Sequence, residues 1–212
     1  GLKIDNLIYL KGVPELHAIK MVGDTIHVGS CVTHHSFEIN PIINKYLPAL
    51  ANEWSNVGNI RTRLVGTIGG NILKNDPNYD VTPALIALNS VAHYSQINGL
   101  HRIPLIKLNR KRPPGILTAI KIPIRNNLEF SMNRTLKPLV NLAVSASVNK
   151  DSINDINVGI GCAFPKPLQV RIKNELNISS KNLRRLVSNL VREFADELPN
   201  PIDDIFASAS YR

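Results

Sequence analysis

The segment from Thr67 to Asn71 constrains the fold more than any other part of the chain, because it holds two adjacent glycines. Gly69 and Gly70 can both take positive φ, which lets successive backbone N–H groups converge on one point. Such a nest binds an anion, and the missing Cβ lets a diphosphate approach the backbone closely. The side chains of Thr67 and Asn71 add a hydroxyl and an amide that can donate to phosphate oxygens. From the residues alone, an anion site and a plain turn between two elements both remain open.

The two commonest phosphate-binding motifs are absent. The chain has no Gly-x-Gly-x-x-Gly run of the nicotinamide-binding kind, and no glycine loop that ends in Gly-Lys-Ser or Gly-Lys-Thr. Asp80 lies nine residues after Asn71 and, when ionised, only accepts hydrogen bonds. It would repel a phosphate, and it suits a ribose hydroxyl or a ring N–H instead.

The order of motifs along the chain resembles the FAD-binding medium subunit of the molybdenum hydroxylases, the family of xanthine dehydrogenase and carbon monoxide dehydrogenase. The central match is the run from Arg63 to Asn71, which is similar to the family's Arg-Asn-x-Gly-Thr-Ile-Gly-Gly-Asn pattern. Further matching segments follow the family's order on both sides: Val13 to Leu16, Ile26 to Gly29, Pro77 to Asp80, Pro83 to Leu88, Gly99 to Leu105 and Pro201 to Arg212.

This resemblance implies an α+β fold, in which a flavin-binding domain of the vanillyl-alcohol-oxidase-like (PCMH) type precedes a small α+β domain with an antiparallel sheet. It also implies FAD as the cofactor, whose redox chemistry the protein positions and tunes. The residues that match the family's cofactor contacts are Thr67, Ile68, Gly69, Gly70 and Asn71 at the diphosphate, Asp80 as a hydrogen-bonding partner, and Leu117 against the flavin or adenine.

The resemblance further implies a place in a multi-subunit oxidoreductase. Such a subunit relays electrons between a small subunit with two 2Fe-2S clusters and an external acceptor, while a molybdopterin-binding large subunit oxidises the substrate. A flavin-free scaffold subunit of the same complex is the alternative. The family's earlier glycine-rich diphosphate loop precedes the point where this sequence begins, and Leu64 and Phe206 stand where the family has Asn and Arg.

We expect two domains: an FAD-binding domain at residues 1–124, with an incomplete N-terminal subdomain, and a C-terminal medium-subunit domain at residues 125–212. Apolar residues at three- and four-residue steps between Ser36 and Val57 predict a helical region that Pro48 kinks or splits, with Trp54 in the core. The same spacing predicts an amphipathic helix from Asn182 to Leu198.

The net charge invites a polyanionic partner, because 25 Lys and Arg against 16 Asp and Glu give +9. The basic cluster from Lys107 to Arg112 suits phosphate attraction. No aromatic residues interleave with it, so we expect no nucleic-acid partner. The segment from Thr67 to Asn71 contains no cation, and flavin binding therefore does not explain the excess charge.

The remaining features exclude several protein classes. Cys31 and Cys162 are far apart and outside any Cys-x-x-Cys pair, and the six histidines lack metal-ligand spacing, so we expect free thiols and no metal site. No apolar run approaches the roughly 18 to 20 residues that span a bilayer, and no signal peptide is evident. We expect a cytoplasmic protein without a membrane span.

Overall fold

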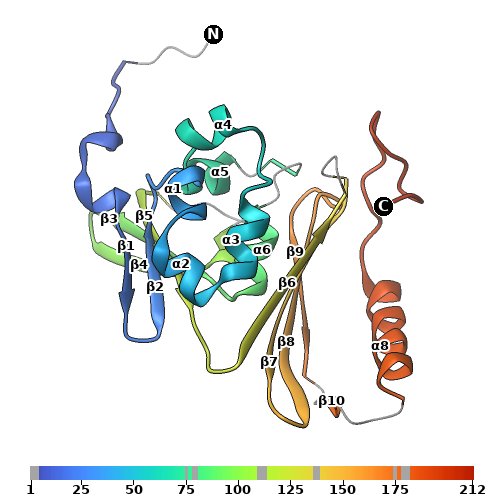
Figure 1. Ribbon diagram of the computed structural model, residues 1–212. Coiled ribbons are helices and arrows are strands. Elements are labelled where there is room, and N and C mark those ends of the chain that lie inside the picture. The colour runs from blue at the N-terminus through green and yellow to red at the C-terminus, as the bar shows by residue number, and fades with distance from the viewer. Residues whose placement is uncertain are drawn as a thin grey trace.

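The computed structural model describes residues 5–74, 76–77, 81–108, 114–135, 139–173, 176–177 and 182–212. Two antiparallel five-stranded sheets lie on either side of a layer of short helices, and one long helix lies on the outer side of the second sheet (Figure 1). This mixture of helices with separate antiparallel sheets confirms the expected α+β class.

The first sheet has the strand order β1-β2-β5-β3-β4. Its strands are β1 (Ile19–Val22), β2 (Thr25–Gly29), β3 (Val91–Gln96), β4 (Gly99–Pro104) and β5 (Ile116–Pro123). Two 3-10 helices, η1 (Leu10–Gly12) and η2 (Pro14–His17), precede it. Side chains alternate between its faces, so Ile26 and Val28 are buried against the helices while Thr25 and His27 lie on the opposite face.

The helical layer contains α1 (His34–Glu38), α2 (Pro41–Tyr46), α3 (Pro48–Trp54), α4 (Ile60–Val65), α5 (Ile68–Lys74) and α6 (Val81–Ala87). The expected helical region from Ser36 to Val57 is thus three short helices, because Pro41 and Pro48 each occupy a first turn. All seven residues of α6 are buried between the two sheets, and Trp54 is 2% exposed, which confirms its expected core position.

The short helix α7 (Leu105–Leu108) follows β4 and completes the first half of the chain. The second sheet has the order β10-β8-β7-β6, with β9 paired to β8. Its strands are β6 (Leu128–Arg134), β7 (Asn141–Val148), β8 (Ser152–Gly161), β9 (Leu168–Ile172) and β10 (Leu176–Asn177). Gly159 lets β8 pass directly over the backbone of Pro83 in α6, where any Cβ would meet that backbone.

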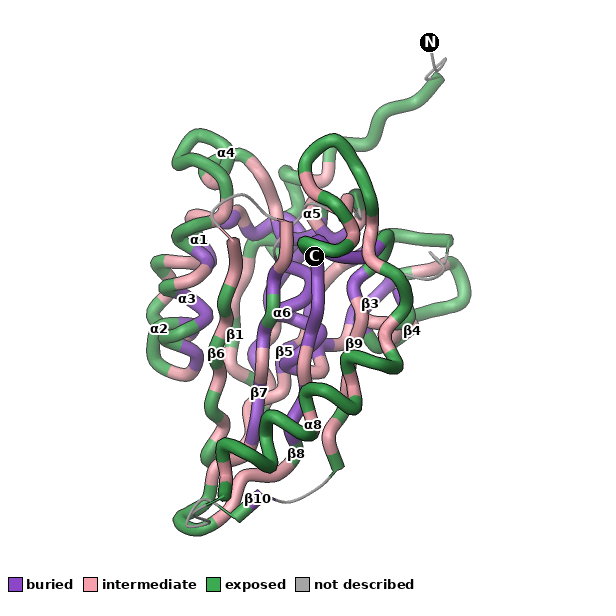
Figure 2. Tube along the Cα trace, turned by 90° about the vertical axis from the view of Figure 1, so that its right-hand side faces the viewer, coloured by how far each residue is buried: buried purple, intermediate pink, exposed green. Residues whose placement is uncertain are grey.

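The amphipathic helix predicted near the C-terminus is α8 (Leu183–Glu197). Leu183 and Leu190 pack beside the small cluster of Ala146, Ile156 and Leu176, yet none of the residues of α8 is buried. Figure 2 shows burial concentrated in α6 and the strands beside it, with α8 mostly exposed. Among the described residues, no helix combines the length and the apolarity that crossing a bilayer requires.

The boundary expected between residues 124 and 125 falls in the connection from β5, which ends the first sheet, to β6, which begins the second. The largest hydrophobic cluster nevertheless reaches from the first sheet through the helices to Ala143 of β7. The division into two domains at this boundary stays a prediction.

Candidate functional site

The segment that sequence analysis singled out connects α4 to α5 at one end of the helical layer. Gly66 ends α4 in an extended conformation, with φ −68° and ψ 138°, and α5 begins at Ile68. The loop from Ser30 to Thr33 runs antiparallel beside this connection, with an isolated bridge between Thr33 and Thr67. This antiparallel bridge therefore fixes the connection to the loop from Ser30 to Thr33 just before α5 begins.

The two glycines have a different conformation from the one predicted. Gly69 and Gly70 lie within the first turn of α5, and neither has positive φ. A Cβ on Gly69 would lie 2.7 Å from the carbonyl oxygen of Ser30 and 2.8 Å from its Cβ. The reason for glycine at this position is close approach of two backbones, and the predicted positive-φ nest is wrong.

The backbone donors of this turn are already occupied. The N–H of Ile68 donates to the carbonyl of Val32 at 3.0 Å, and that of Gly69 donates to the carbonyl of Ser30 at 2.9 Å. The N–H groups of the next two residues donate to Thr67: Gly70 to its Oγ1 at 3.1 Å and Asn71 to its carbonyl at 2.9 Å. An anion at this point cannot rely on converging backbone N–H groups.

Three residues of the segment still offer groups to a ligand. Thr67 accepts from Gly70 through Oγ1, so the proton of its own hydroxyl remains available for donation. The Oδ1 atom of Asn71 is buried and has no hydrogen-bond partner among the described residues. Gly70 is exposed and presents bare backbone between them. Ile68 and Gly69, in contrast, are buried.

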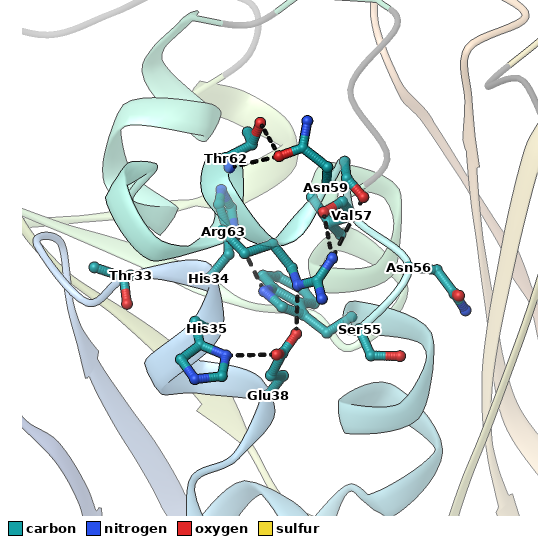
Figure 3. Close-up of polar contacts among 12 residues, drawn as sticks. Thr33, His34, His35, Glu38, Ser55, Asn56, Val57, Asn59, Thr62 and Arg63 are labelled. Carbon is teal, nitrogen blue, oxygen red and sulfur yellow. Dashed lines mark hydrogen bonds and ion pairs between the residues drawn. The ribbon is translucent and has the colours of Figure 1, made fainter.

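A buried ion pair fixes α4 against α1 and so positions the start of α5. The Nε atom of Arg63 lies 2.8 Å from Oε2 of Glu38, with side-chain exposures of 13% and 9% (Figure 3). The other carboxylate oxygen of Glu38 lies 2.7 Å from Nδ1 of His35. Arg63 also donates from one terminal nitrogen to the carbonyls of Val57 and Gly58, each at 3.3 Å. Arg63, which matches the arginine of the family motif, therefore makes contacts that stabilise this part of the chain.

His34 supports the same region from below. Its backbone N–H donates to the carbonyl of Gly66 at 3.0 Å, and its ring atom Nδ1 accepts from the indole N–H of Trp54 at 3.2 Å. Burial, assisted by the positive charge of Arg63 and opposed by Glu38, lowers the pKa of His34 to about 4. The imidazole is therefore neutral at pH 7, which the acceptor role of Nδ1 requires.

The other two predicted contacts have different outcomes. Leu117 lies in β5 and is 3% exposed, as part of the main hydrophobic cluster. Thr118, the residue after Leu117, accepts from the N–H of Ser30 at 3.0 Å, and the carbonyl of Ser30 in turn accepts from Gly69. A chain of two backbone hydrogen bonds therefore links β5, next to Leu117, to the start of α5. Its contact with a flavin or adenine stays a prediction. Asp80 lies outside the described residues.

Sequence reasoning missed the residues that hold this site together. Ser30 fits against Gly69, and Glu38 pairs with Arg63, but neither belongs to a recognisable spacing pattern. Gly69 was the only sequence signal for a close approach at this position, and a glycine does not identify the segment that approaches it. Among the described residues, no group of three or more His, Cys, Asp and Glu side chains is placed to hold a metal ion.

Comparison with known proteins identifies the family. Residues 1–125 match the model of the FAD binding domain in molybdopterin dehydrogenase. The chain belongs to this family. The family-level resemblance, the cofactor FAD and the oxidoreductase class are thereby confirmed. The unpaired Oδ1 of Asn71, the free proton of Thr67 and the bare backbone of Gly70 fit a bound cofactor at the matching motif.

Relatives of this molybdopterin dehydrogenase family match almost the whole chain. The glyceraldehyde dehydrogenase medium chain of Sulfolobus acidocaldarius is 23% identical, over 100% of this chain and 79% of the relative. The nicotine 6-hydroxylase medium subunit of Paenarthrobacter nicotinovorans is 28% identical, over 97% of this chain and 76% of the relative. This chain is therefore similar to the FAD-binding medium subunits of molybdenum-hydroxylase-type complexes.

Solved structures of the family have the same fold. The structure of Cu,Mo-CO dehydrogenase matches with a TM-score of 0.81 at 19% identity, over 95% of this chain and 74% of the other. Quinoline 2-oxidoreductase from Pseudomonas putida 86 matches with a TM-score of 0.76 at 20% identity, over the same shares of the two chains. These matches confirm the expected fold class of a flavin-binding domain followed by a smaller α+β part.

Proposed function

We propose that this chain holds FAD at the start of α5 and serves as the electron-relay subunit of a molybdenum-hydroxylase-type oxidoreductase. The observation that carries the proposal is the available hydroxyl proton of Thr67 and the unpartnered Oδ1 of Asn71, on either side of the bare backbone of Gly70 at the family's own cofactor motif. Bound FAD supplies a redox centre that exchanges electrons with an iron–sulfur cluster and with an external acceptor.

The chain's own residues position the cofactor. The hydroxyl of Thr67 and the amide NH2 of Asn71 donate to oxygens of the diphosphate, and the buried Oδ1 of Asn71 accepts from a hydroxyl or N–H group of the cofactor. Gly70 keeps the approach free of a side chain. Asp80 as a further hydrogen-bonding partner and Leu117 as an apolar contact complete the proposed set, while Ile68 and Gly69 hold the turn from beneath.

Preorganisation comes from the surrounding contacts. Gly69 fits against Ser30, and the pair of Glu38 and Arg63 fixes the helix that leads into the turn. A site whose residues are locked by packing loses little conformational entropy on binding. The partners proposed for the relay are a small subunit with 2Fe-2S clusters and a molybdopterin-binding large subunit. A cytoplasmic location and the absence of a nucleic-acid partner stay predictions.

Titration of the chain with FAD tests the proposal through quenching of flavin fluorescence and displacement of its visible maxima. Asn71→Ala should weaken FAD binding about tenfold, the value of one hydrogen bond in a buried site. Gly70→Val should weaken it more, because a branched side chain would fill the approach beside Thr67 Oγ1, which lies 3.0 Å from a Cβ built on Gly70.

Asn52→Ala is the matched control, since Asn52 is an exposed asparagine in α3. It should leave FAD binding unchanged. Equal binding by Asn71→Ala, Gly70→Val and the original chain would place the cofactor elsewhere. Failure of the folded chain to bind FAD at all would favour the flavin-free scaffold subunit instead.

A further inference from the structure

The outer face of the first sheet carries a cluster of basic side chains from strands that are far apart in the sequence. In the strand register, Lys20 of β1 pairs with His27 of β2, and His27 pairs with Lys121 of β5. Lys121 pairs with Val91 of β3, and two residues further along β3, His93 pairs with Arg102 of β4. Paired and alternate residues share one face of a sheet, so these basic groups all lie on the face away from the helices.

This face is open, and the strands that form it carry no acidic residue. The helices of the layer cover the opposite face (Figure 1). The side chains of Lys20, His27, His93, Arg102 and Lys121 make no hydrogen bond or ion pair within the part of the chain that the structure describes. The nearest acid along β2 is Asp24 in the β1–β2 turn, whose carboxylate accepts from the hydroxyl of Thr25 at 3.1 Å.

A hollow of about 310 Å³ lies in the middle of the cluster. Its lining consists of Thr25, His27, Val91, His93, Arg102, Lys121 and Pro123. His93 is 5% exposed and so is held within the sheet surface. A volume of this size suits a small ligand, and the lining offers it imidazole, guanidinium and ammonium donors around two apolar residues.

We propose that this hollow is a binding site for a small oxyanion of the phosphate or sulfate type with at least two negative charges. Arg102 and Lys121 supply the charge, and His27 and His93 supply ring donors. Lys20 lies one strand beyond His27 and adds to the positive field at the margin. The site is distinct from the start of α5 and does not depend on FAD.

The mutual repulsion of the groups that line the hollow favours a bound anion. Burial and the charges of Lys121, Arg102 and His27 lower the pKa of His93 to about 4, and burial with Lys121 lowers that of His27. Burial and Arg102 lower the pKa of Lys121 as well. These groups therefore destabilise one another's charged forms, and an anion among them removes that penalty.

Binding should consequently take up protons. The charged groups that face the two imidazoles are Lys20 from β1, Arg102 from β4 and Lys121 from β5, and all three are cationic. A bound dianion raises the pKa of both imidazoles, so affinity rises as the pH falls. Sulfate is the suitable probe for this dependence because its charge does not change over the range in which histidine titrates.

Calorimetric titration of the full chain with inorganic pyrophosphate at constant ionic strength tests the site. Lys121→Gln and Arg102→Gln should each weaken binding about tenfold or more, the value of one charge-assisted hydrogen bond. Arg185→Gln, which removes the same charge from an exposed position on α8, should change binding less than twofold. Equal weakening by Arg185→Gln would show a general effect of net charge and overturn the proposal.

Histidine NMR signals give a second readout that needs no variant. Pyrophosphate and sulfate should shift the ring signals of His27 and His93, while His17, His34, His35 and His101 serve as internal controls. Unchanged signals of His27 and His93 would overturn the proposal. So would a single-stranded oligonucleotide that binds through Lys121 and Arg102 more than about tenfold tighter than pyrophosphate, because the ligand would then be a nucleic-acid backbone.

Discussion

The two sides of the first sheet differ in whether their charged and polar side chains have partners within the chain. On the inner side, the helical layer holds Glu38 against Arg63 and His35, and Trp54 against His34. On the outer side, Lys121 and its basic neighbours lie together without a partner among the described residues. Polar groups that satisfy one another stabilise a fold, whereas polar groups left unsatisfied at a hollow are available to a ligand. The contrast separates residues that build this chain from residues that bind.

The largest expected effect belongs to the inner side, at Gly69. Gly69→Ala should prevent native folding or lower the free energy of unfolding by more than about 4 kcal/mol, because the new Cβ would meet the backbone of Ser30. Gly70→Ala is the control, since its Cβ meets only the Thr67 hydroxyl at 3.0 Å, and it should change stability by less than about 1 kcal/mol. Urea denaturation followed by circular dichroism measures both. Similar stability of the two variants would contradict the close approach of the two segments.

The ion pair of the inner side should come next. Glu38→Gln should lower the free energy of unfolding by about 3 kcal/mol, because it leaves the guanidinium of Arg63 buried without a countercharge. Glu129→Gln, at an exposed position in β6, should change it by less than about 0.5 kcal/mol. Chemical denaturation of both variants at neutral pH gives the comparison. An effect of Glu38→Gln as small as that of the control would show that the ion pair of Glu38 and Arg63 does not stabilise the chain.

The buried imidazole of His34 predicts a pH dependence. Its pKa is lowered from 6.5 to about 4, so between these values the unfolded chain binds a proton that the folded chain does not. Stability should therefore rise with pH across this window, by about 3 kcal/mol from this group, and change no further above it. The difference in unfolding free energy between the original chain and His34→Gln, measured across the window, should follow this curve. A difference that is constant with pH would contradict the assigned protonation state.

The smallest effect is expected on the outer side. Lys121→Gln removes a cation that has only like charges around it, and should stabilise the chain by at most about 0.5 kcal/mol at low salt. Arg63→Gln, the same substitution on the inner side, should destabilise it strongly. Denaturation of the two variants at low and high salt measures the contrast directly. Comparable destabilisation by both would mean that Lys121 has a structural partner.

Much of the fold was accessible from the sequence. The residues of β2 and β5 alternate in polarity, as is typical of half-buried strands, and Asn98-Gly99 is a residue pair typical of hairpins such as β3–β4, in which Gly99 has φ +117°. Helical spacing identified α8. These elements were predictable because side-chain periodicity is a local property. The three helices between residues 34 and 54 were only partly predictable, because Pro41 starts a new helix within what looked like one stripe.

The location of the candidate site stays a prediction, but the positive φ expected of its glycines was wrong. The motif indicated Thr67 to Asn71, yet glycine has two uses, positive φ and close approach, and sequence alone did not distinguish them. Gly69 serves the second, against a segment almost forty residues earlier. The basic cluster on the outer face could not be predicted from the sequence, because it too depends on contacts between distant segments. Its members are isolated in the sequence, and only the register of five strands brings His27, His93 and Lys121 to one face.

The most direct measurement for the central claim is an experimental structure of the chain with FAD bound. The account predicts that the diphosphate lies within hydrogen-bonding distance of Thr67 Oγ1 and of the amide nitrogen Nδ2 of Asn71, over the bare backbone of Gly70. It also predicts that Asn71 Oδ1 accepts from a hydroxyl or N–H group of the cofactor, and that Glu38 and Arg63 remain paired. A cofactor bound away from the start of α5, with Asn71 Oδ1 still lacking a partner, would contradict it.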